Sequence, residues 1–222
     1  MCGKFTQRNE WRELVRLDEI ACASISPAGI ETITPIRTAQ VIALDGNGAR
    51  KSVPMRWGLI PSHAGDARDA KPHIHARAET IDTKPTFRDS FLHRRGLIVV
   101  STFNEGEEVG SKTVQYVCTP KDGKHIAIAV IWDRWRDEGG PSLLTFAMVT
   151  TPPCEIIGTI TDRMPALLED SDWAKWLGEE PTSVEELKAM LRISPRDLDM
   201  ERASRPAPPP KPARDTRQAE LF

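Results

Sequence analysis

Four apolar segments follow one another at short intervals in the middle of the chain, and they constrain its fold more than any other feature. The runs are GLIVVSTF, KTVQYVC, HIAIAVIW and LLTFAMVTT, within residues 96–151. They are rich in β-branched residues, and the turn signals EGEEVG, PKDGK and RDEGGP separate them. Short apolar runs bounded by such turns are typical of strands in an antiparallel sheet or barrel. The sequence therefore predicts a strand-dominated centre.

Further strands precede this centre, and helices flank it. The runs AQVIAL and SVPMRWG, joined by the turn former DGNG, predict a hairpin over 39–58. Strict alternation in HIHARAE predicts an extended segment over 73–79. Apolar spacing predicts helices over 9–21, around TFRDSFLHR, and over SDWAKWL and TSVEELKAMLR near the end. We expect an α+β fold with a mixed, mostly antiparallel barrel-like sheet and flanking helices.

A change of composition divides the chain near its C-terminal end. The chain has 222 residues, of which 39% are apolar, and we assign residues 1–195 to one domain. Five prolines occupy the seven positions from Pro206 to Pro212. Such a stretch cannot pack as a helix or a central strand, so residues 196–222 are predicted to be a flexible tail.

Charge and cysteine content exclude several classes of protein. The net charge of -2 excludes a globally basic nucleic-acid coat, so any nucleic-acid contact must use a local patch. The four cysteines lie far apart, which argues against a zinc ribbon or a disulfide framework and favours a reducing cytoplasm. We interpret Cys22, Cys118 and Cys154 as structural.

No apolar window is long enough to span a membrane. We expect a cytoplasmic monomer without a metal or cofactor.

The chain begins MCGKF, and its second residue has unusual chemical potential. Removal of Met1 would leave Cys2 with a free α-amine beside its thiol. The α-amine titrates near 7.7–8.0 and the thiol near 8.5, so both nucleophiles are partly available at neutral pH. Such an aminothiol condenses with an aldehyde to an imine, which the thiol closes to a thiazolidine. A second-position cysteine alone is more often unremarkable, so this interpretation needs supporting motifs.

Those motifs occur downstream as PMRWGLIP (54–61), HARAET (75–80) and TDRMP (161–165). Together with MCGKF they resemble the SOS-response-associated-peptidase family, the abasic-site processing proteins of the DNA damage response. The resemblance implies a barrel-like fold with a positively charged DNA groove. It also implies that the mature N-terminal cysteine traps the aldehyde of an abasic site in single-stranded DNA as a thiazolidine. The family chemistry includes strand cleavage of the lyase type and removal of the protein's own first residue.

The resemblance assigns two catalytic positions directly. Cys2 matches the family nucleophile. The segment VVSTFNEG corresponds to the family sequence P-A-D-G-F-Y-E-W and places Glu105 on the catalytic glutamate, with Glu107 and Glu108 as close rivals. A carboxyl group there would move protons while the imine forms.

Two other catalytic positions depart from the family pattern. The histidine of H-x-R-M-P is Thr161 in this chain, and the asparagine of N-A-R-A-E-T is His75. Because imidazole titrates in the range that acid and base catalysis needs, we interpret the pair of changes as an imidazole moved across the pocket. The alternative is a divergent branch with weakened or altered chemistry.

Several residues are candidates for holding DNA. Lys4 replaces the usual arginine and can contact phosphate as a point charge. Arg56, Arg77 and Arg163 can hold phosphates, and Trp57 can stack on a nucleobase, as single-strand binding requires. The alternatives are solvated surface arginines and a core tryptophan. His73 and His75 lack the further ligands that a metal site needs.

The last five residues, QAELF, resemble the motif that binds the bacterial sliding clamp. Leu221 and Phe222 can fill an apolar pocket while Gln218 forms hydrogen bonds at a second site. A flexible tether would raise the effective concentration of the motif, which predicts an association with replication forks in the nucleoid.

Three functions remain open on the sequence alone. The first is covalent capture of abasic sites in single-stranded DNA through Cys2. The second is a non-catalytic single-strand-binding module of the same fold. The third is a cysteine hydrolase, which lacks a clear Cys-His-Asn arrangement.

Overall fold

A computed structural model describes residues 2–8, 30–65, 71–136 and 142–203. The predicted helix over 9–21, part of the polar loop after Pro61, Cys22 and the QAELF motif lie outside these ranges.

Five strands form a closed barrel at the centre of the molecule. They are β3 (Thr38–Leu44), β4 (Arg50–Trp57), β6 (Arg95–Val100), β9 (Ile126–Arg136) and β10 (Ser142–Thr151). The order is β10-β4-β3-β6-β9, and β9 pairs with β10 to close the ring. The β4–β10 pairing is parallel and the others are antiparallel. The mixed, mostly antiparallel barrel predicted from the sequence is confirmed, as is the hairpin of β3 and β4.

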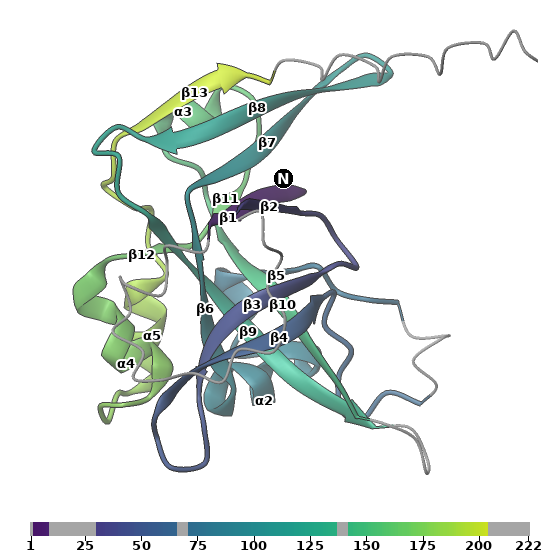
Figure 1. Cartoon of the computed structure of the whole chain (residues 1–222), viewed down its shortest axis with the longest axis vertical. Coiled ribbons are helices and arrows are strands. Elements are labelled where there is room, and N and C mark those ends of the chain that lie inside the picture. Colours follow the sequence, from purple (N-terminus) through teal and green to yellow (C-terminus); the bar gives the residue numbers. More distant parts are fainter. Residues whose placement is uncertain (1, 9–29, 66–70, 137–141, 204–222) are drawn as a thin grey trace, which may run out of the picture.

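Short strands extend the barrel on two sides. β5 (His75–Arg77) runs parallel to β10, and β11 (Met164–Pro165) pairs with β10 in the antiparallel direction. β12 (Leu167–Leu168) pairs with β9. The HARAET and DRMP motifs therefore meet at the same barrel strand, although more than 80 residues separate them (Figure 1).

A second sheet of five antiparallel strands lies against the barrel. Its order is β13-β8-β7-β1-β2, and the bounds are β1 (Lys4–Arg8), β2 (Ile30–Ile33), β7 (Thr102–Val109), β8 (Lys112–Pro120) and β13 (Leu198–Arg202). Strands β7, β8 and β13 project beyond the barrel, and we call them the arm (Figure 1).

The arm corrects two expectations. The segment EGEEVG was expected to be a turn, but it lies in β7, because pairing with β8 outweighs its weak strand propensity. The turn begins at Gly110, whose φ is 61°. Residues 198–202, expected in the flexible tail, form the edge strand β13. They precede the first proline of the tail, and an edge strand needs hydrogen bonds on one side only.

Helices α2 (Pro85–His93), α4 (Trp173–Leu177) and α5 (Val184–Met190) pack on one face of the barrel strands, whereas α3 (Glu155–Gly158) lies beside β13 of the second sheet. Single 3-10 turns are η1 (Ala78–Thr80) and η2 (Asp170–Asp172). The predicted helices near 86–94, 171–177 and 182–192 are present, and a capping box of Ser183 and Glu186 opens α5. Within the described residues, no helix is long and apolar enough to cross a membrane.

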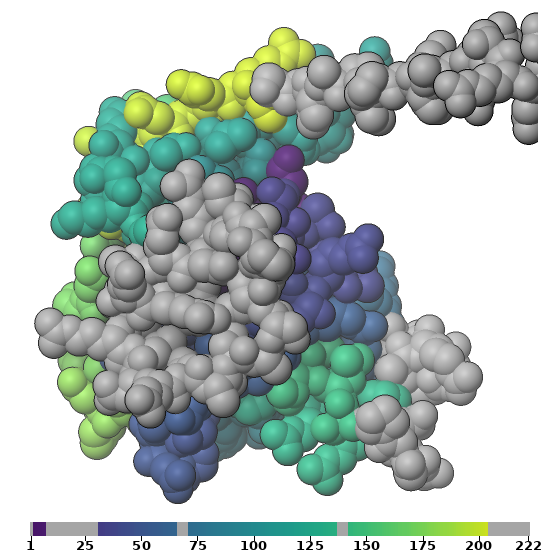
Figure 2. Space-filling model, in the orientation of Figure 1, coloured from purple at the N-terminus to yellow at the C-terminus, as the bar shows by residue number. Residues whose placement is uncertain are grey.

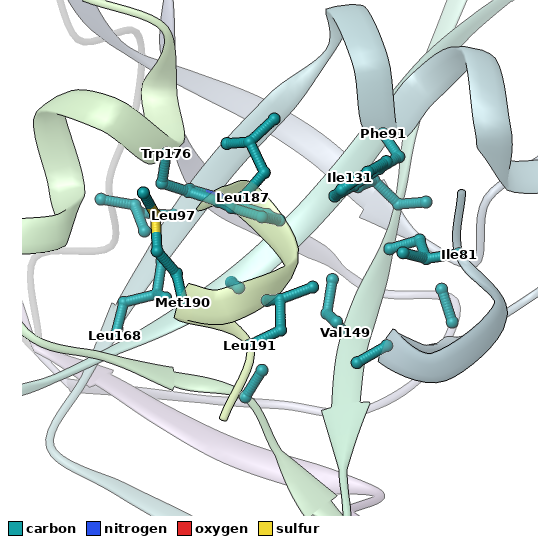
Figure 3. Packing of buried hydrophobic residues seen from close by; sticks show 14 of the residues in the cluster. Ile81, Phe91, Leu97, Ile131, Val149, Leu168, Trp176, Leu187, Met190 and Leu191 are labelled. Carbon is teal, nitrogen blue, oxygen red and sulfur yellow. The ribbon is translucent and has the colours of Figure 1, made fainter. Parts of the chain in front are cut away.

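Both faces of the barrel strands are buried, which explains their continuous apolar runs. On β9, Ile126 and Ile128 belong to a cluster shared with the second sheet, whereas Ala127 and Ala129 face the helices. The small alanines leave room for larger side chains such as Trp176 and Leu187 (Figure 3).

The surface is hollowed where the arm leaves the barrel. Figure 2 shows an open concavity beneath the arm, with the N-terminal strand β1 at its inner end. Strand β1 therefore lies at the base of a groove that is open to solvent.

Candidate active site

Cys2 lies directly before β1 and is buried, with 1% of its surface exposed. Its thiol donates to the carbonyl oxygen of Lys4 at 3.5 Å. Burial, and after it the negative charge of Glu105, raise the pKa of the Cys2 thiol well above its ordinary value. The resting sulfur is therefore a neutral thiol at neutral pH, and its ionisation must be coupled to proton transfer within the site.

Glu105 projects from β7 toward the backbone of Cys2. The strand register places it opposite Tyr116 and two residues after the core residue Phe103. The carboxyl group is fully buried. Burial raises the pKa of Glu105 to about 7, a rise that the N-terminal amine and, to a smaller extent, the nearby Cys2 backbone N–H oppose. Both protonation states of Glu105 are consequently populated near neutral pH, as a group that donates and accepts protons requires.

His75 holds the other side of the same residue. Its Nε2 lies 2.8 Å from the carbonyl oxygen of Cys2. A carbonyl oxygen only accepts, so Nε2 carries the proton and Nδ1 of the neutral ring is an acceptor. Burial lowers the pKa of His75 to about 4, so the ring is neutral at neutral pH. His75 therefore fixes the orientation of Cys2 without placing a positive charge beside it.

Arg163 and Glu79 tie the HARAET and DRMP motifs together. The guanidinium of Arg163 donates to both carboxylate oxygens of Glu79, at 2.5 and 2.9 Å, and to the carbonyl oxygen of Thr150 at 2.5 Å. The ion pair lowers the pKa of Glu79. This bidentate contact joins β11, η1 and β10, and so supports the position of β5 and His75.

Thr161 lies on the segment between α3 and β11. It is half-buried, and its backbone N–H donates to the carbonyl oxygen of Ile157 at 3.1 Å. The charge of the next residue, Asp162, contributes to the raised pKa of Glu105. Sequence reasoning missed Asp162 as a member of the site, although its place between Thr161 and Arg163 was a signal that could have found it.

The proposed DNA-binding residues fall into two groups. Lys4 and Arg56 are half-buried, and Arg77 is exposed on the same face of β5 as His75. Trp57 is fully buried, donates from Nε1 to the carbonyl oxygen of Ile74 at 2.8 Å, and stands edge-on to His75. The structure gives Trp57 a packing role behind His75 in place of the expected base stacking.

Arg163 also differs from its expected role. It is 7% exposed, and Glu79 and Thr150 occupy its guanidinium, so its charge serves the internal ion pair rather than a phosphate. A buried arginine with a bidentate carboxylate partner is a structural group.

The remaining cysteines are placed as follows. Cys118 is buried on β8 opposite Phe103, and burial raises its pKa to about 12. Cys154 is half-buried and precedes α3. Across the described ranges, no group of three or more His, Cys, Asp or Glu side chains could hold a metal ion.

Comparison with known proteins gives a consistent result. The chain matches the family "SOS response associated peptidase (SRAP)" over residues 1–206. It is 31% identical over 204 residues to the abasic site processing protein YoqW of Bacillus subtilis (strain 168), covering 90% of this chain and 89% of YoqW. It is 32% identical over 204 residues to YoaM of the same organism, another abasic site processing protein, covering 90% of this chain and 88% of YoaM.

A solved structure shows the same fold. The crystal structure of a protein from Bacteroides thetaiotaomicron superposes with a TM-score of 0.78 at 22% identity, covering 91% of this chain and 92% of that one. The fold, the N-terminal cysteine motif and the match over nearly the whole chain lead to one conclusion: the chain belongs to the SOS response associated peptidase family.

Proposed function

We propose that this chain captures abasic sites in single-stranded DNA covalently, through the amine and the thiol of Cys2 after Met1 has been removed. The observation that carries the proposal is the placement of the buried Glu105 carboxyl close to the thiol and the backbone nitrogen of the buried Cys2. That nitrogen becomes the α-amine when Met1 is lost, so the reacting nitrogen already lies against a buried carboxyl group. The names of the relatives, abasic site processing proteins, support the same substrate.

The chemistry follows from the two nucleophiles and one proton relay. The α-amine attacks C1′ of the ring-opened deoxyribose, and Glu105 accepts the proton that the nitrogen loses. The protonated Glu105 gives this proton to the aldehyde oxygen, which forms a carbinolamine; Glu105 then moves the second proton of the nitrogen to the departing hydroxyl, so one water leaves and an imine forms. The thiol adds across the C=N bond: sulfur bonds to carbon, and the thiol proton goes to nitrogen. A pKa of about 7 suits Glu105 to both directions of transfer.

His75 has a positioning role in this scheme. Its hydrogen bond to the carbonyl oxygen of Cys2 fixes the residue from the side opposite its nitrogen. The free Nδ1 acceptor can take a hydrogen bond from a sugar hydroxyl while the ring opens. In this proposal His75 supplies the imidazole that Thr161 does not.

DNA enters through the hollow beneath the arm. Lys4 and Arg77 flank the site from β1 and β5. With a net charge of -2 for the whole chain, such local cations must supply the attraction to phosphate.

A crosslinking assay tests the proposal. The purified protein is incubated with a uracil-containing oligonucleotide that uracil glycosylase has treated, and a denaturing gel is run. A denaturation-resistant band is expected for the wild type and not for Cys2→Ala. The matched variant Cys2→Ser keeps the amine but lacks the thiol, so its band should survive only after borohydride reduction. A reversible gel shift without any band would instead indicate a non-catalytic binding module.

The C-terminal motif gives a second, independent proposal. We propose that Gln218, Leu221 and Phe222 bind a bacterial sliding clamp and place the domain near replication forks. Deletion of residues 218–222 should abolish a pull-down with purified clamp and leave crosslinking to free abasic oligonucleotide unchanged. Retained clamp binding after the deletion would refute it.

A further inference from the structure

Ile36 adopts a backbone conformation that its side chain disfavours. Among the residues that the structure describes, it is the one residue other than glycine with a positive φ, at 69°. A β-branched residue is a steric outlier in this region, because its side chain crowds its own backbone. Strain of this kind persists only where surrounding contacts enforce it, and it is concentrated at functional sites.

Three hydrogen bonds hold the strained turn in place. The Ile36 N–H donates to the carbonyl oxygen of Trp57 at 2.8 Å, and the Trp57 N–H donates to that of Arg37 at 2.9 Å. The Arg37 N–H closes the turn on the carbonyl oxygen of Thr34 at 3.1 Å. The turn is therefore fixed to the barrel strand that carries Trp57, the residue that packs behind His75.

The side chain that this strain supports is not used for packing a core. Ile36 is 47% exposed, as one of three large apolar side chains with high exposure among the described residues. Its Cδ1 lies 3.2 Å from the position that a Cβ at Gly58 would occupy, and Ile74 Cγ2 lies 3.9 Å from the same point. Ile74 directly precedes His75. The Cδ1 end of Ile36 thus packs beside the segment that leads into His75, while about half of the residue is open to water.

The turn also lies at the mouth of the hollow. The segment that joins β2 to β3 runs out beneath the arm (Figure 1), on the side of the concavity opposite the arm (Figure 2). The neighbouring Arg37 is exposed and carries a charge suited to phosphate. An exposed apolar side chain beside a cation at the rim of a groove complements single-stranded DNA. The apolar side chain can contact a flat base, and the cation can contact the charged backbone.

We propose that Ile36 is a wedge that packs against the nucleobase next to the abasic nucleotide. The inference rests on the proposed function. An abasic site leaves one face of the neighbouring base uncovered, and the exposed aliphatic surface of Ile36 covers this face. By occupying the gap, Ile36 keeps the two flanking bases from stacking on each other and holds the sugar open toward Cys2. Ile36 is a positioning residue, since it touches the neighbouring base and not the reacting atoms.

The test uses an oligonucleotide with a tetrahydrofuran site, which has no aldehyde and cannot react with Cys2. The fluorescent base 2-aminopurine stands next to this site. Binding of the wild type should raise the fluorescence, because the wedge separates the base from its neighbour. Ile36→Gly and Ile36→Asn should lose this rise and bind about five- to tenfold more weakly. Both residues tolerate positive φ, so neither variant should be less stable than the wild type in thermal unfolding.

The matched control is Ile193→Ala, because Ile193 is also 47% exposed but lies beyond α5. This variant should bind and fluoresce like the wild type. The inference is overturned if Ile36→Asn retains wild-type affinity and fluorescence, or if Ile193→Ala loses as much. The two proposals fail separately: a wedge effect on the tetrahydrofuran site without a crosslink to a true abasic site would refute covalent capture alone. A crosslink without any effect of Ile36 would refute the wedge alone.

Discussion

Two glutamates, Glu79 and Glu105, flank the residues that hold Cys2, and their environments differ sharply. Glu79 faces the guanidinium of Arg163, which lowers its pKa. Glu105 is buried against the Cys2 nitrogen, and burial raises its pKa to about 7. The same side chain is therefore a structural anion at position 79, and at position 105 it has the properties of the proton carrier that we propose. The two glutamates differ in burial and in neighbours and not in residue type.

Replacement of the reactive carboxyl should have the largest effect. Glu105→Gln keeps the shape and removes the proton relay, so the single-turnover rate of crosslinking should fall by about 10²- to 10⁴-fold. Glu79→Gln, the matched change in the ion pair, should leave the rate per folded molecule within about threefold, because it touches no reacting atom. Equal losses in both variants would remove the distinction between the two regions.

The two glutamates should also give opposite pH dependences of stability. Glu105 has a raised folded-state pKa, so its favourable contribution is complete below its ordinary value of 4.5 and lost as the pH rises through about 7. Between pH 5 and pH 8, the free energy of unfolding of the wild type should therefore fall by about 3 kcal/mol relative to that of Glu105→Gln.

For Glu79 the sign is reversed. Its lowered pKa gives a contribution that is present above 4.5 and lost as the pH falls through the folded-state value. Glu79→Gln should thus be less stable than the wild type at pH 7 and approach it in acid. Urea unfolding of the three proteins across this range measures both slopes, and parallel curves would contradict the assignment of the two environments.

Removal of the His75 imidazole should have an intermediate effect on the rate of crosslinking. His75→Ala should slow crosslinking about tenfold or more, because Cys2 loses the contact to its carbonyl oxygen, whereas Thr161→Ala should change the rate less than about twofold. His75→Gln can restore the donor, and a partial recovery is expected in that variant. Small, equal effects of His75→Ala and Thr161→Ala would refute the hypothesis that His75 supplies the imidazole that the family has at position 161.

The smallest effect is expected at the rim. Arg77→Ala should weaken binding to single-stranded DNA by a few-fold and reduce the dependence of affinity on salt by about one charge. Equilibrium titrations at several salt concentrations measure this slope. An unchanged slope would show that Arg77 does not contact phosphate.

Local sequence signals predicted most of the fold. Alternating and continuous apolar runs located the barrel strands, DGNG located the hairpin turn, and helical spacing in TSVEELKAMLR located α5. The arm was less predictable. Its strand β7 contains an acidic, glycine-containing run, and β13 follows the helices close to the proline-rich end. Strand β7 is held by a tight hairpin with β8, and β13 by a long-range contact with the same strand; the propensity of the residues themselves encodes neither pairing.

The candidate site was predicted unevenly for a similar reason. Motif resemblance brought Cys2, His75 and Glu105 to attention, and the structure places His75 on the carbonyl oxygen of Cys2 and the buried Glu105 close to the same residue. Burial could not be read from residue type, so the internal role of Arg163 was missed and the core position of Trp57 was only the alternative to base stacking. The strained turn at Ile36 left no sequence signal, because positive φ at a β-branched residue is enforced by tertiary contacts.

The mass of the covalent product tests the central claim most directly. Condensation of the Cys2 amine with an abasic oligonucleotide, followed by ring closure, predicts an adduct equal to the protein without Met1 plus the oligonucleotide less one water. Digestion should place the bond on the N-terminal peptide that begins with Cys2. An adduct that retains Met1, or a bond located on any other peptide, would contradict capture by the α-amine and thiol of Cys2.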